Sequence, residues 1–484
     1  MNTRPVAYFD LDGTVRATSQ FIYPRAKQVT LYPGVIERLV ELRDRGYLLA
    51  GITNQGGVAK GIITIEEVRA AVVRTQELLG PAALDFVTFC PHYFQADGRY
   101  CDCKKPAPGL ALDALSALHN ATLRGGFVVG DDMNADAGLA RCLSIPFVDA
   151  HRFRECNVGE LIKTMEPEKM RCAISEDKVA GVLVGMAVGD ALGAAVEFWP
   201  RSRVSATFPG GTTEMQASHT GKKGEYTDDT QMALLLADSL LKHSRLDPIH
   251  IAQQFLRWSQ TAKDVGIQIS RVVRMQGYSG QAEESAMLDY NNHPNAAAGN
   301  GAVMRCAPIA LFHHDSIPML LADSRRSARL THGDPKAQSS CVLVNCAIDH
   351  FLRGGELTGC LQAGLSYLSS IEKAAWARLE GISSLQESEI SSSGYTVATV
   401  EAAFWSLLRS TSFEGAVVAA VSLGDDADSV AAVTGAMAGA YYGYNAIPER
   451  WKQELLNERK IHRTALDLAG ISAAVAEAQG EHHG

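Results

Sequence analysis

Apolar and polar positions follow two different rhythms along the chain. In residues 1–150, short apolar runs of strand length alternate with amphipathic segments of helical spacing. The apolar runs are PVAYFD, YLLAGIT, FVTFC and GGFVVGD, and the helical segments include GVIERLVELRDRG and TIEEVRAAVVRTQELLG. Alternation of this kind predicts a parallel sheet with helices packed on it.

From Lys178 onward the pattern is helical throughout. The segments KVAGVLVGMAVGDALGAAVEF, DDTQMALLLADSLL, HIAQQFLRWSQ, DPKAQSSCVLVNCAIDHFL, TVATVEAAFWSLLRS and DSVAAVTGAMAGAYYG repeat apolar residues at helical spacing and are rich in alanine. Small residues allow helices to pack closely, so this half predicts an all-α domain. A polar stretch within it, SSLQESEISSSGYT, predicts a surface loop.

The change of rhythm predicts two domains and a tail. We expect an α/β domain at residues 1–165, an all-α domain at 176–465 and a C-terminal tail at 466–484. The length of 484 residues agrees, because single cores rarely grow beyond about 250–300 residues.

Composition narrows the function classes. With 46% hydrophobic and 20% charged residues, the chain is typical of a soluble globular protein. Its net charge of −9 argues against a broad basic surface for duplex nucleic acid, so we expect nucleic acid to bind only as a modified substrate.

We expect a cytoplasmic protein with no membrane partner. No apolar run reaches the roughly 18 residues of a spanning helix, the start lacks a signal peptide, and ten cysteines in so long a chain are not a disulfide scaffold.

Polar residues follow three of the predicted strands in the first half. Asp10, Thr53 and Asp131 each stand at a strand end. In open parallel sheets ligands bind at the carboxyl ends of the strands, so we expect these residues to converge on one site. Asp12 follows Asp10 at i+2, and two such carboxylates can divide the work: one attacks phosphorus while the other handles the proton of the leaving oxygen.

Further residues in this half suit a phosphate and a cation. Asn54 offers an amide to phosphate oxygens, and Lys105 supplies a positive charge. The segment VVGDDMNAD offers oxygen ligands for Mg²⁺, of which we rank Asp131 above Asp132 and Asp136. The motif DLDG alone would indicate only a turn. Four motifs in this order, DLDG, the segment with Thr53 and Asn54, Lys105, and VVGDDMNAD, favour a catalytic site.

Together these four motifs resemble the haloacid dehalogenase superfamily of phosphatases, in particular the branch with histidinol-phosphate and heptose bisphosphate phosphatases. The resemblance implies an aspartyl-phosphate mechanism, with Asp10 as nucleophile and Asp12 as general acid/base. It implies that Thr53 and Lys105 bind phosphate, and that Asp131 completes a Mg²⁺ site with Asp10 and the Asp12 carbonyl. Little sequence separates the motifs, so a Rossmann-like domain without a large cap is expected.

The stretch FCPHYFQADGRYCDCKKP predicts a zinc loop. Cys90, His92, Cys101 and Cys103 form a Cys-x-His…Cys-x-Cys set, and four such ligands around a short loop suit tetrahedral Zn²⁺. A full protein set leaves no position for water, so the zinc is expected to be structural; reduced core cysteines are the alternative. The loop resembles the zinc loop of the same branch, except that Lys104, which we expect to contact substrate, stands where that branch usually has Arg. Lysine cannot make the bidentate phosphate contact of arginine, which weakens any transfer of the heptose substrate.

The helical half carries two acidic clusters, each directly before an apolar helix. Simple helix capping is the plain explanation of either cluster, but the pair favours a site for two Mg²⁺ or Mn²⁺ ions. The candidate ligands are Thr227, Asp228, Asp229, Asp426, Asp428 and Ser429.

These clusters lie in sequence segments that resemble the ADP-ribosylglycohydrolase family, and the resemblance runs from Lys178 to about Trp451. The segments are GDALGAAVE, YTDDTQMAL, GNGAVMRCAPIAL, THGDPKA and DDADSVAAVTGAMAGAYYG. The resemblance implies an all-α fold in which the six candidate residues hold a dinuclear metal centre. One departure is Asp425, which stands where the family more often has Gly and which adds a carboxylate beside the second metal.

The same resemblance assigns residues around the metals. It implies that Glu197 positions substrate or acts as acid/base, and that Asp190 lies beside the metals. Asn300 and Gly301 lie in a loop of small residues whose backbone N–H groups suit a diphosphate, although a tight helix–helix turn would look the same. His332 matches a Thr-His loop near the ligand.

We therefore expect a bifunctional hydrolase that removes a phosphate with one half and ADP-ribose with the other, through an oxocarbenium-like transition state. An ADP-ribosylated phosphate would give both halves one substrate. A second half that senses ADP-ribose without turnover, and a phosphatase for nucleic-acid ends, are the alternatives. The sequence leaves open whether ADP-ribose is attached to arginine, serine, a nucleic-acid end or a small molecule.

Overall fold

A computed structural model of the chain describes residues 4–17, 23, 25–93, 103–106, 108–143, 145–164, 174–219, 221–314 and 316–470. By internal packing the chain divides into two compact units, residues 1–170 with 316–322, and residues 171–315 with 323–484. The boundaries of the two domains at residues 165, 176 and 465 stay a prediction, because compactness does not fix where a domain ends.

The first unit contains the parallel sheet that the alternating pattern predicts. Its strands are β1 (Arg4–Phe9), β2 (Leu48–Asn54), β3 (Phe86–Cys90), β4 (Ala121–Gly130) and β5 (Phe147–Asp149), in the order β3-β2-β1-β4-β5 and all parallel. The strand β5 was not among the predicted ones. Since the chain moves outward from β1 in one direction and from β4 in the other, the sheet reverses between β1 and β4, and their carboxyl ends form the site where such sheets bind ligands.

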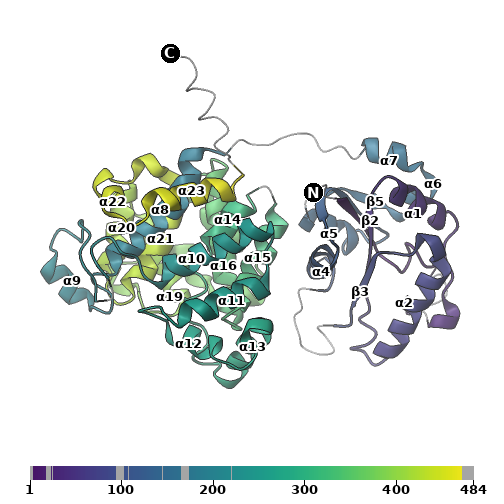
Figure 1. Cartoon of the computed structure of the whole chain (residues 1–484), viewed down its shortest axis with the longest axis horizontal. Helices are drawn as coiled ribbons and strands as arrows, with labels where there is room; N and C mark the ends of the chain where they lie inside the picture. The colour runs from purple at the N-terminus through teal and green to yellow at the C-terminus, as the bar shows by residue number, and fades with distance from the viewer. Residues whose placement is uncertain are drawn as a thin grey trace, which may run out of the picture. The chain divides into compact units, whose positions relative to one another are not determined.

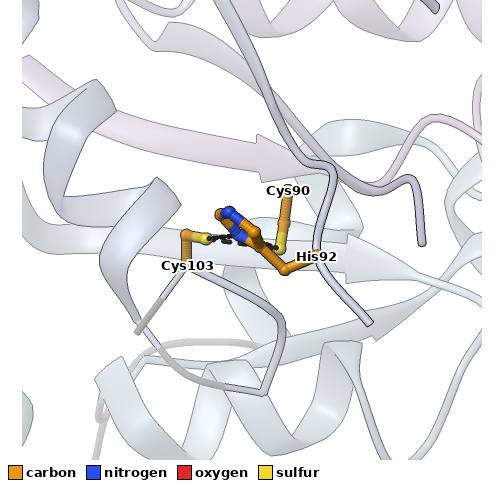
Figure 2. A group of neighbouring side chains, drawn as sticks. All are labelled: Cys90, His92 and Cys103. Atoms are coloured by element: carbon orange, nitrogen blue, oxygen red, sulfur yellow. Dashed lines mark hydrogen bonds between the residues drawn. The ribbon is translucent and has the colours of Figure 1, made fainter. Parts of the chain in front are cut away.

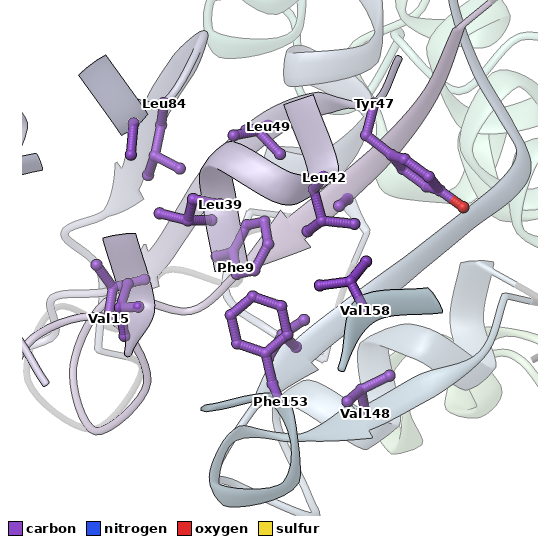
Figure 3. Packing of buried hydrophobic residues seen from close by; sticks show 14 of the residues in the cluster. Phe9, Val15, Leu39, Leu42, Tyr47, Leu49, Leu84, Val148, Phe153 and Val158 are labelled. Atoms are coloured by element: carbon purple, nitrogen blue, oxygen red, sulfur yellow. The ribbon is translucent and has the colours of Figure 1, made fainter. Parts of the chain in front are cut away.

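Helices cover both faces of this sheet (Figure 1). Alternate residues of β1 point to opposite faces: Ala7 and Phe9 join one core, and Val6 and Tyr8 join the other. Figure 3 shows the first core, in which Phe9 packs on Phe153 with ring centroids 5.3 Å apart. The helices are α1 (Val35–Asp44), α2 (Ile65–Leu79), α4 (Gly109–Ala117), α5 (Asp136–Leu143), α6 (Ala150–Glu155) and α7 (Val158–Thr164), with short 3₁₀ turns at η1 (Ala26–Gln28) and η2 (Gly80–Ala82).

The described residues from 174 onward are helical, as the alanine-rich pattern predicts (Figure 1). The α-helices are α8 (Glu176–Gly193), α9 (Arg201–Thr207), α10 (Asp228–His243), α11 (Pro248–Ser259), α12 (Ile267–Val273), α13 (Ala282–Asn292), α14 (Ala307–Phe312), α15 (Ile317–Arg329), α16 (Pro335–Leu352), α17 (Cys360–Leu365), α18 (Ser370–Ala375), α19 (Thr396–Leu408), α20 (Phe413–Ser422), α21 (Ala427–Tyr442), α22 (Glu449–Glu454) and α23 (Glu458–Leu468). The 3₁₀ helices are η3 (Tyr278–Gly280), η4 (Leu357–Gly359), η5 (Ala377–Ser384), η6 (Glu387–Glu389) and η7 (Tyr444–Ala446). None of the helices in the described part of the chain combines the length and apolar character that crossing a bilayer needs.

The helices α8 and α21 pack backbone against backbone. A Cβ atom on Gly181 or Gly185 would overlap the carbonyl oxygen of Gly439 or Gly435, and the reverse holds for both pairs. Residues later in α8 contact residues earlier in α21, so the two helices run antiparallel. At the end of this contact, a Cβ atom on Gly193 would lie 2.5 Å from the Cα of Asp428. The glycines thereby bring the C-terminal end of α8 against the acidic start of α21.

We predict that Gly439→Ala destabilises the helical unit. The added methyl group overlaps the backbone of Gly181, and such overpacking lowers the free energy of unfolding by about 1–3 kcal/mol. Chemical denaturation monitored by circular dichroism measures the change. Gly210→Ala is the matched control, because a Cβ atom there meets no atom within 4 Å. Equal stability of the two variants would contradict the packing constraint.

Candidate functional site

The first candidate site surrounds the turn that follows β1. Asp10 is buried at the strand end, and Gly13 continues the turn with φ +84°, a conformation that glycine adopts without strain. A Cβ atom on Gly13 would overlap the carboxylate of Asp131, which follows β4. The reversal of the sheet therefore places the acidic turn after β1 against the acidic end of β4, as the strand-end pattern predicts.

A buried lysine links two carboxylates at this edge. Lys105 Nζ lies 2.5 Å from Asp10 Oδ1 and 2.6 Å from Asp136 Oδ1. Asp10, Asp131 and Asp136 each offer one oxygen, and these oxygens lie within 4.8 Å of one another, which suits a small hard cation. Asp136, ranked below Asp131 in the sequence analysis, lies at the start of α5 and belongs to the same oxygen cluster. Asp132 instead accepts hydrogen bonds from the backbone N–H groups of Asn134 and Ala135.

Asp12 presents one carboxylate oxygen to the protein and leaves the other available. Its Oδ2 accepts hydrogen bonds from Arg16 Nη2 at 2.6 Å, from Gln55 Nε2 at 2.6 Å and from Thr53 Oγ1 at 3.3 Å. Its Oδ1 is buried and has no hydrogen-bond partner among the described residues. An oriented carboxylate with one free oxygen is suited to proton transfer. Arg16 and Gln55 were not predicted, because nothing in their spacing singled them out.

Two predicted phosphate contacts have other partners in the structure. The side chain of Asn54 donates to the carbonyl of Lys105 at 3.1 Å and accepts from its N–H at 2.9 Å, so Asn54 positions the lysine. Lys104 Nζ lies 4.5 Å from the centroid of the Tyr93 ring, and Lys60 Nζ lies 3.7 Å from the same centroid. Two ammonium groups on one ring form a second positive region near the buried Lys105.

Burial dominates the titration of this site. It raises the pKa of Asp10 to about 7, against the opposing charge of Lys105 and together with repulsion from Asp136 and Asp12. Burial alone would lower the pKa of Lys105, but the carboxylates of Asp10 and Asp136 outweigh it and raise that pKa. Burial also raises the pKa of Asp131, with further repulsion from Asp136. A cation at these oxygens would relieve the repulsion, so the residues present fit a Mg²⁺ ion.

Three of the four predicted zinc ligands come together (Figure 2). His92 Nδ1 lies 3.3 Å from Cys103 Sγ and 3.6 Å from Cys90 Sγ, and the two sulfur atoms are 3.2 Å apart. Two thiols and an imidazole that converge in this way suit Zn²⁺. Cys101 lies outside the described residues, so its part as the fourth ligand stays a prediction.

The second candidate site lies where α8, α10 and α21 meet. Asp190, in the last turn of α8, accepts hydrogen bonds from both the N–H and the hydroxyl of Thr227 and of Thr230, at 2.6–3.0 Å. Both oxygens of this fully buried carboxylate are thus used to hold the start of α10. Asp190 lies within the site, as predicted, but its contacts are those of a positioning residue.

Several predicted metal ligands converge at the starts of α10 and α21, whereas Asp228 belongs to none of the ligand groups found among the described residues. Oxygens of Asp190, Asp229 and Asp428 form one cluster within 4.8 Å, and oxygens of Glu197, Asp426 and Asp428 form a second. Thr227 Oγ1 lies 3.2 Å from Asp229 Oδ2 and 3.3 Å from Asp428 Oδ2. Ser429, next along α21, is buried beside Met304. Two adjoining clusters that share Asp428 match a dinuclear centre.

The electrostatics of these carboxylates also fit cations. Burial, followed by repulsion from Asp264 and Asp190, raises the pKa of Asp228 to about 8. Burial and neighbouring carboxylates hold the pKa values of Asp229 and Asp428 well above the usual range. Asp229 Oδ1 is buried without a hydrogen-bond partner among the described residues. Hard oxygen ligands that repel one another in a buried site suit Mg²⁺ or Mn²⁺.

Burial also raises the pKa of Glu197 to about 8, and among its neighbours Asp264 adds the largest repulsion. Asp264 and His219 were not predicted, because each stands in a loop without a recognisable motif. Oxygens of Glu197 and Asp264 and a ring nitrogen of His219 lie within 4.8 Å of one another.

The small-residue loop adjoins the second cluster. Asn300 Nδ2 donates to Asp426 Oδ2 at 2.7 Å and to Thr399 Oγ1 at 3.0 Å. A Cβ atom on Gly301 would lie 3.0 Å from the ring of His332, a buried histidine whose pKa burial holds well below its usual range. Arg305, which sequence reasoning missed, is buried and donates to the carbonyl of Gly301.

Part of the predicted surface loop belongs to this site. The stretch 383–396 includes Ser392, which is buried and whose carbonyl accepts from the N–H of Asp426 at 3.0 Å. The carbonyl of Gly394 accepts from the N–H of Asn300 at 3.0 Å. Most of the stretch is exposed, as expected of a surface loop, and two of its backbone carbonyls nevertheless fix residues of the site.

Asp425 lies apart from the two clusters. Its side chain is exposed, and its backbone has φ +52°, which explains why glycine suits the same position. Its carboxylate belongs to none of the ligand groups found among the described residues.

Comparison with known proteins identifies both halves of the chain. The family model described as ADP-ribosylglycohydrolase matches residues 171–480, and the model described as polynucleotide kinase 3 phosphatase matches residues 5–191. An ADP-ribosylarginine hydrolase of Serratia proteamaculans is 33% identical, over 61% of this chain and 81% of its own length. A D-glycero-beta-D-manno-heptose-1,7-bisphosphate 7-phosphatase of Rhodopseudomonas palustris is 31% identical, over 36% of this chain and 96% of its own length.

A solved ADP-ribosylglycohydrolase-related protein complex is 35% identical, with a TM-score of 0.52, over 61% of this chain and 98% of that chain. The chain is thus a hydrolase that belongs to the ADP-ribosylglycohydrolase family and carries a phosphatase domain of the haloacid dehalogenase type ahead of the glycohydrolase region.

Proposed function

We propose that the chain is a bifunctional hydrolase. Its first site hydrolyses a phosphomonoester with Mg²⁺, and its second hydrolyses an ADP-ribosyl bond with a pair of Mg²⁺ or Mn²⁺ ions. The observation that carries the proposal is the presence of two carboxylate sites, Asp10–Asp131–Asp136 in the first and the paired groups that share Asp428 in the second. Buried oxygens without a hydrogen-bond partner among the described residues accompany both, at Asp12 in the first site and at Asp229 and Glu197 in the second.

In the first site, a carboxylate oxygen of Asp10 attacks phosphorus and forms an aspartyl-phosphate as the bond to the leaving oxygen breaks. The free Oδ1 of Asp12 gives a proton to that oxygen, and then takes one from the water that hydrolyses the intermediate. Lys105, which contacts Asp10, and Thr53, which donates to Asp12, are the candidates for binding the phosphate oxygens. A Mg²⁺ ion held by Asp10, Asp131 and the Asp12 carbonyl would supply further positive charge to the phosphoryl oxygens.

In the second site, water adds to the anomeric carbon of ADP-ribose as the bond to the leaving group breaks; the leaving group gains a proton and the water loses one. Glu197 is buried beside the clusters and is the candidate acid/base for that proton transfer. Asn300 belongs to the small-residue loop that we expect to bind the diphosphate, and its side chain donates a hydrogen bond to Asp426. Substrate binding and metal binding are therefore coupled. Metal ions held by the six candidate ligands would polarise ribose hydroxyls and water.

For the second site we propose ADP-ribosylated arginine as the substrate. The support is the name of the Serratia relative, an ADP-ribosylarginine hydrolase that covers this half. A sensor of ADP-ribose without turnover is the weaker alternative, because Asp425, the departure from the family pattern that could disturb the second metal, is exposed.

For the first site we propose a phosphomonoester that carries a second negative group. Lys60 and Lys104 beside Tyr93 form a positive region suited to that group. A bisphosphate, as for the Rhodopseudomonas relative, meets this description. A nucleic-acid 3′-phosphate meets it as well, and the match to the polynucleotide phosphatase model favours it as a second candidate. An ADP-ribosylated phosphate would let the second site expose the group that the first removes.

Single substitutions should separate the two activities. Asp10→Asn removes the nucleophile and should lower phosphate release by at least ~10³-fold, while ADP-ribose release stays unchanged. Asp228→Asn should do the reverse, because it removes a metal ligand. Phosphate release and ADP-ribose release are measured on the same preparations. Loss of both activities in either variant would contradict two independent sites.

The leaving group can be tested directly. With Mg²⁺ present, we expect ADP-ribosylated arginine to be cleaved at least ~10-fold faster than ADP-ribosylated serine, as measured by release of free ADP-ribose. Faster cleavage of an ADP-ribosylated phosphate end would instead favour one substrate shared by both sites. Binding of ADP-ribose without cleavage of any adduct would favour a sensor.

Metal binding to the second site should strengthen as pH rises. The folded-state pKa values of Asp228 and Glu197, about 8, lie above the value near ~4 of an unfolded carboxyl. Metal-free protein therefore loses stability between about pH 4 and pH 8, because unfolding releases the extra protons, and a cation restores it. We expect a larger gain in Tm on adding Mg²⁺ at pH 8 than at pH 6. In Asp228→Asn the gain should shrink at both pH values.

A further inference from the structure

A third group of ligand side chains adjoins the dinuclear clusters. Glu197 follows α8, His219 stands in the loop before α10, and Asp264 follows α11. One oxygen of each carboxylate and one ring nitrogen lie within 4.8 Å of one another. The group combines one imidazole with two carboxylates, whereas the predicted ligands of the dinuclear centre are oxygen donors alone.

An unpartnered oxygen points into this group. The side chain of Glu197 is only 5% exposed, and its Oε2 has no hydrogen-bond partner among the described residues. His219 Nε2 lies 3.8 Å from this oxygen, too far for a hydrogen bond. Two ligands of one tetrahedral zinc ion stand roughly 3.4 Å apart, since zinc bonds to nitrogen and oxygen are about 2.0–2.2 Å. The spacing therefore suits an ion between the two groups with little movement.

The backbone around Glu197 is held in place. The N–H of Phe198 donates to the carbonyl of Asp425 at 2.6 Å, and the N–H of Asp425 donates to the carbonyl of Trp199 at 2.7 Å. Phe198 itself has φ +61°, a strained value for a bulky residue, which these bonds maintain. Glu197 is thereby fixed between two sets of ligands, because its oxygens also cluster with Asp426 and Asp428.

We propose that Glu197, His219 and Asp264 bind a Zn²⁺-like transition-metal ion, and that this ion inhibits the second site by holding Glu197. Imidazole nitrogen selects zinc over magnesium, and three protein ligands leave one position for water. A glutamate bound to this ion cannot act on a proton at the neighbouring clusters. The inhibition rests on the proposed hydrolase function, whereas the binding site does not.

The test is a calorimetric titration of Zn²⁺ into the full chain in saturating Mg²⁺, after its resident zinc has been counted. Wild type is expected to bind one more zinc ion than His219→Gln, or to bind it at least tenfold more tightly. His293→Gln is the matched control, because His293 is similarly exposed and lies 3.1 Å from the carboxylate of Asp289. It should bind zinc like wild type. Cleavage of ADP-ribosylated arginine should slow at least tenfold with zinc in wild type and His293→Gln, and less in His219→Gln.

Equal zinc binding by wild type and His219→Gln would overturn the site, since the ion would then lie elsewhere, for example in the dinuclear centre. Zinc binding that depends on His219 but leaves cleavage unchanged would overturn the inhibition. Zinc binding that depends on His219 in a protein that cleaves no ADP-ribosyl adduct, with or without zinc, would support the site and count against the proposed function alone.

Discussion

The close contact between α8 and α21 is the constraint on which the helical unit depends. Glycines face one another at two successive turns of the contact, and a single methyl group at Gly181, Gly185, Gly435 or Gly439 would overlap the opposite backbone. Helices that touch in this way cannot slide by one residue, because the glycines would then meet larger side chains. Their fixed register brings Asp190, at the end of α8, to the acidic start of α21. From there Asp190 holds Thr227 and Thr230 and so orients α10.

The two sites manage buried negative charge in different ways. In the phosphatase site, Lys105 lies between Asp10 and Asp136, so the nucleophile has a fixed counter-charge within the protein. In the second site, the hydrogen-bond partners of the carboxylates are hydroxyl, amide and backbone groups, which stabilise the charge less than an ammonium group does. Burial raises carboxyl pKa values in both sites, but in the described part of the chain only the first site has a lysine among its carboxylates, so cations are the natural counter-charge in the second.

Several residues in both sites hold other site residues in position by hydrogen bonds. Asn54 holds the backbone of Lys105, and Arg305 holds the carbonyl of Gly301. The first contact joins residues 51 positions apart and the second residues 4 apart, and both keep the functional groups in place before a substrate arrives. They also explain why a motif alone describes a site incompletely.

The sequence by itself determined the local structure and the chemistry. Alternation of short apolar runs with helical segments predicted β1 to β4 and the helices around them, and the alanine-rich half predicted the helical unit, because periodicity reports which face of an element is buried. Strand ends and paired acidic motifs singled out Asp10, Asp12, Asp131, Asp228 and Asp428, since local motifs carry the identity of reactive groups. Tertiary structure decided the rest. It showed that Asp136 shares Lys105, that Asn54 and Asp190 position their neighbours, and that His219 and Asp264 face Glu197. The contacts of Asp136, Asp190 and Asn54 join residues 31, 37 and 51 positions apart, and no local pattern encodes which distant side chains meet once the helices and the sheet have packed.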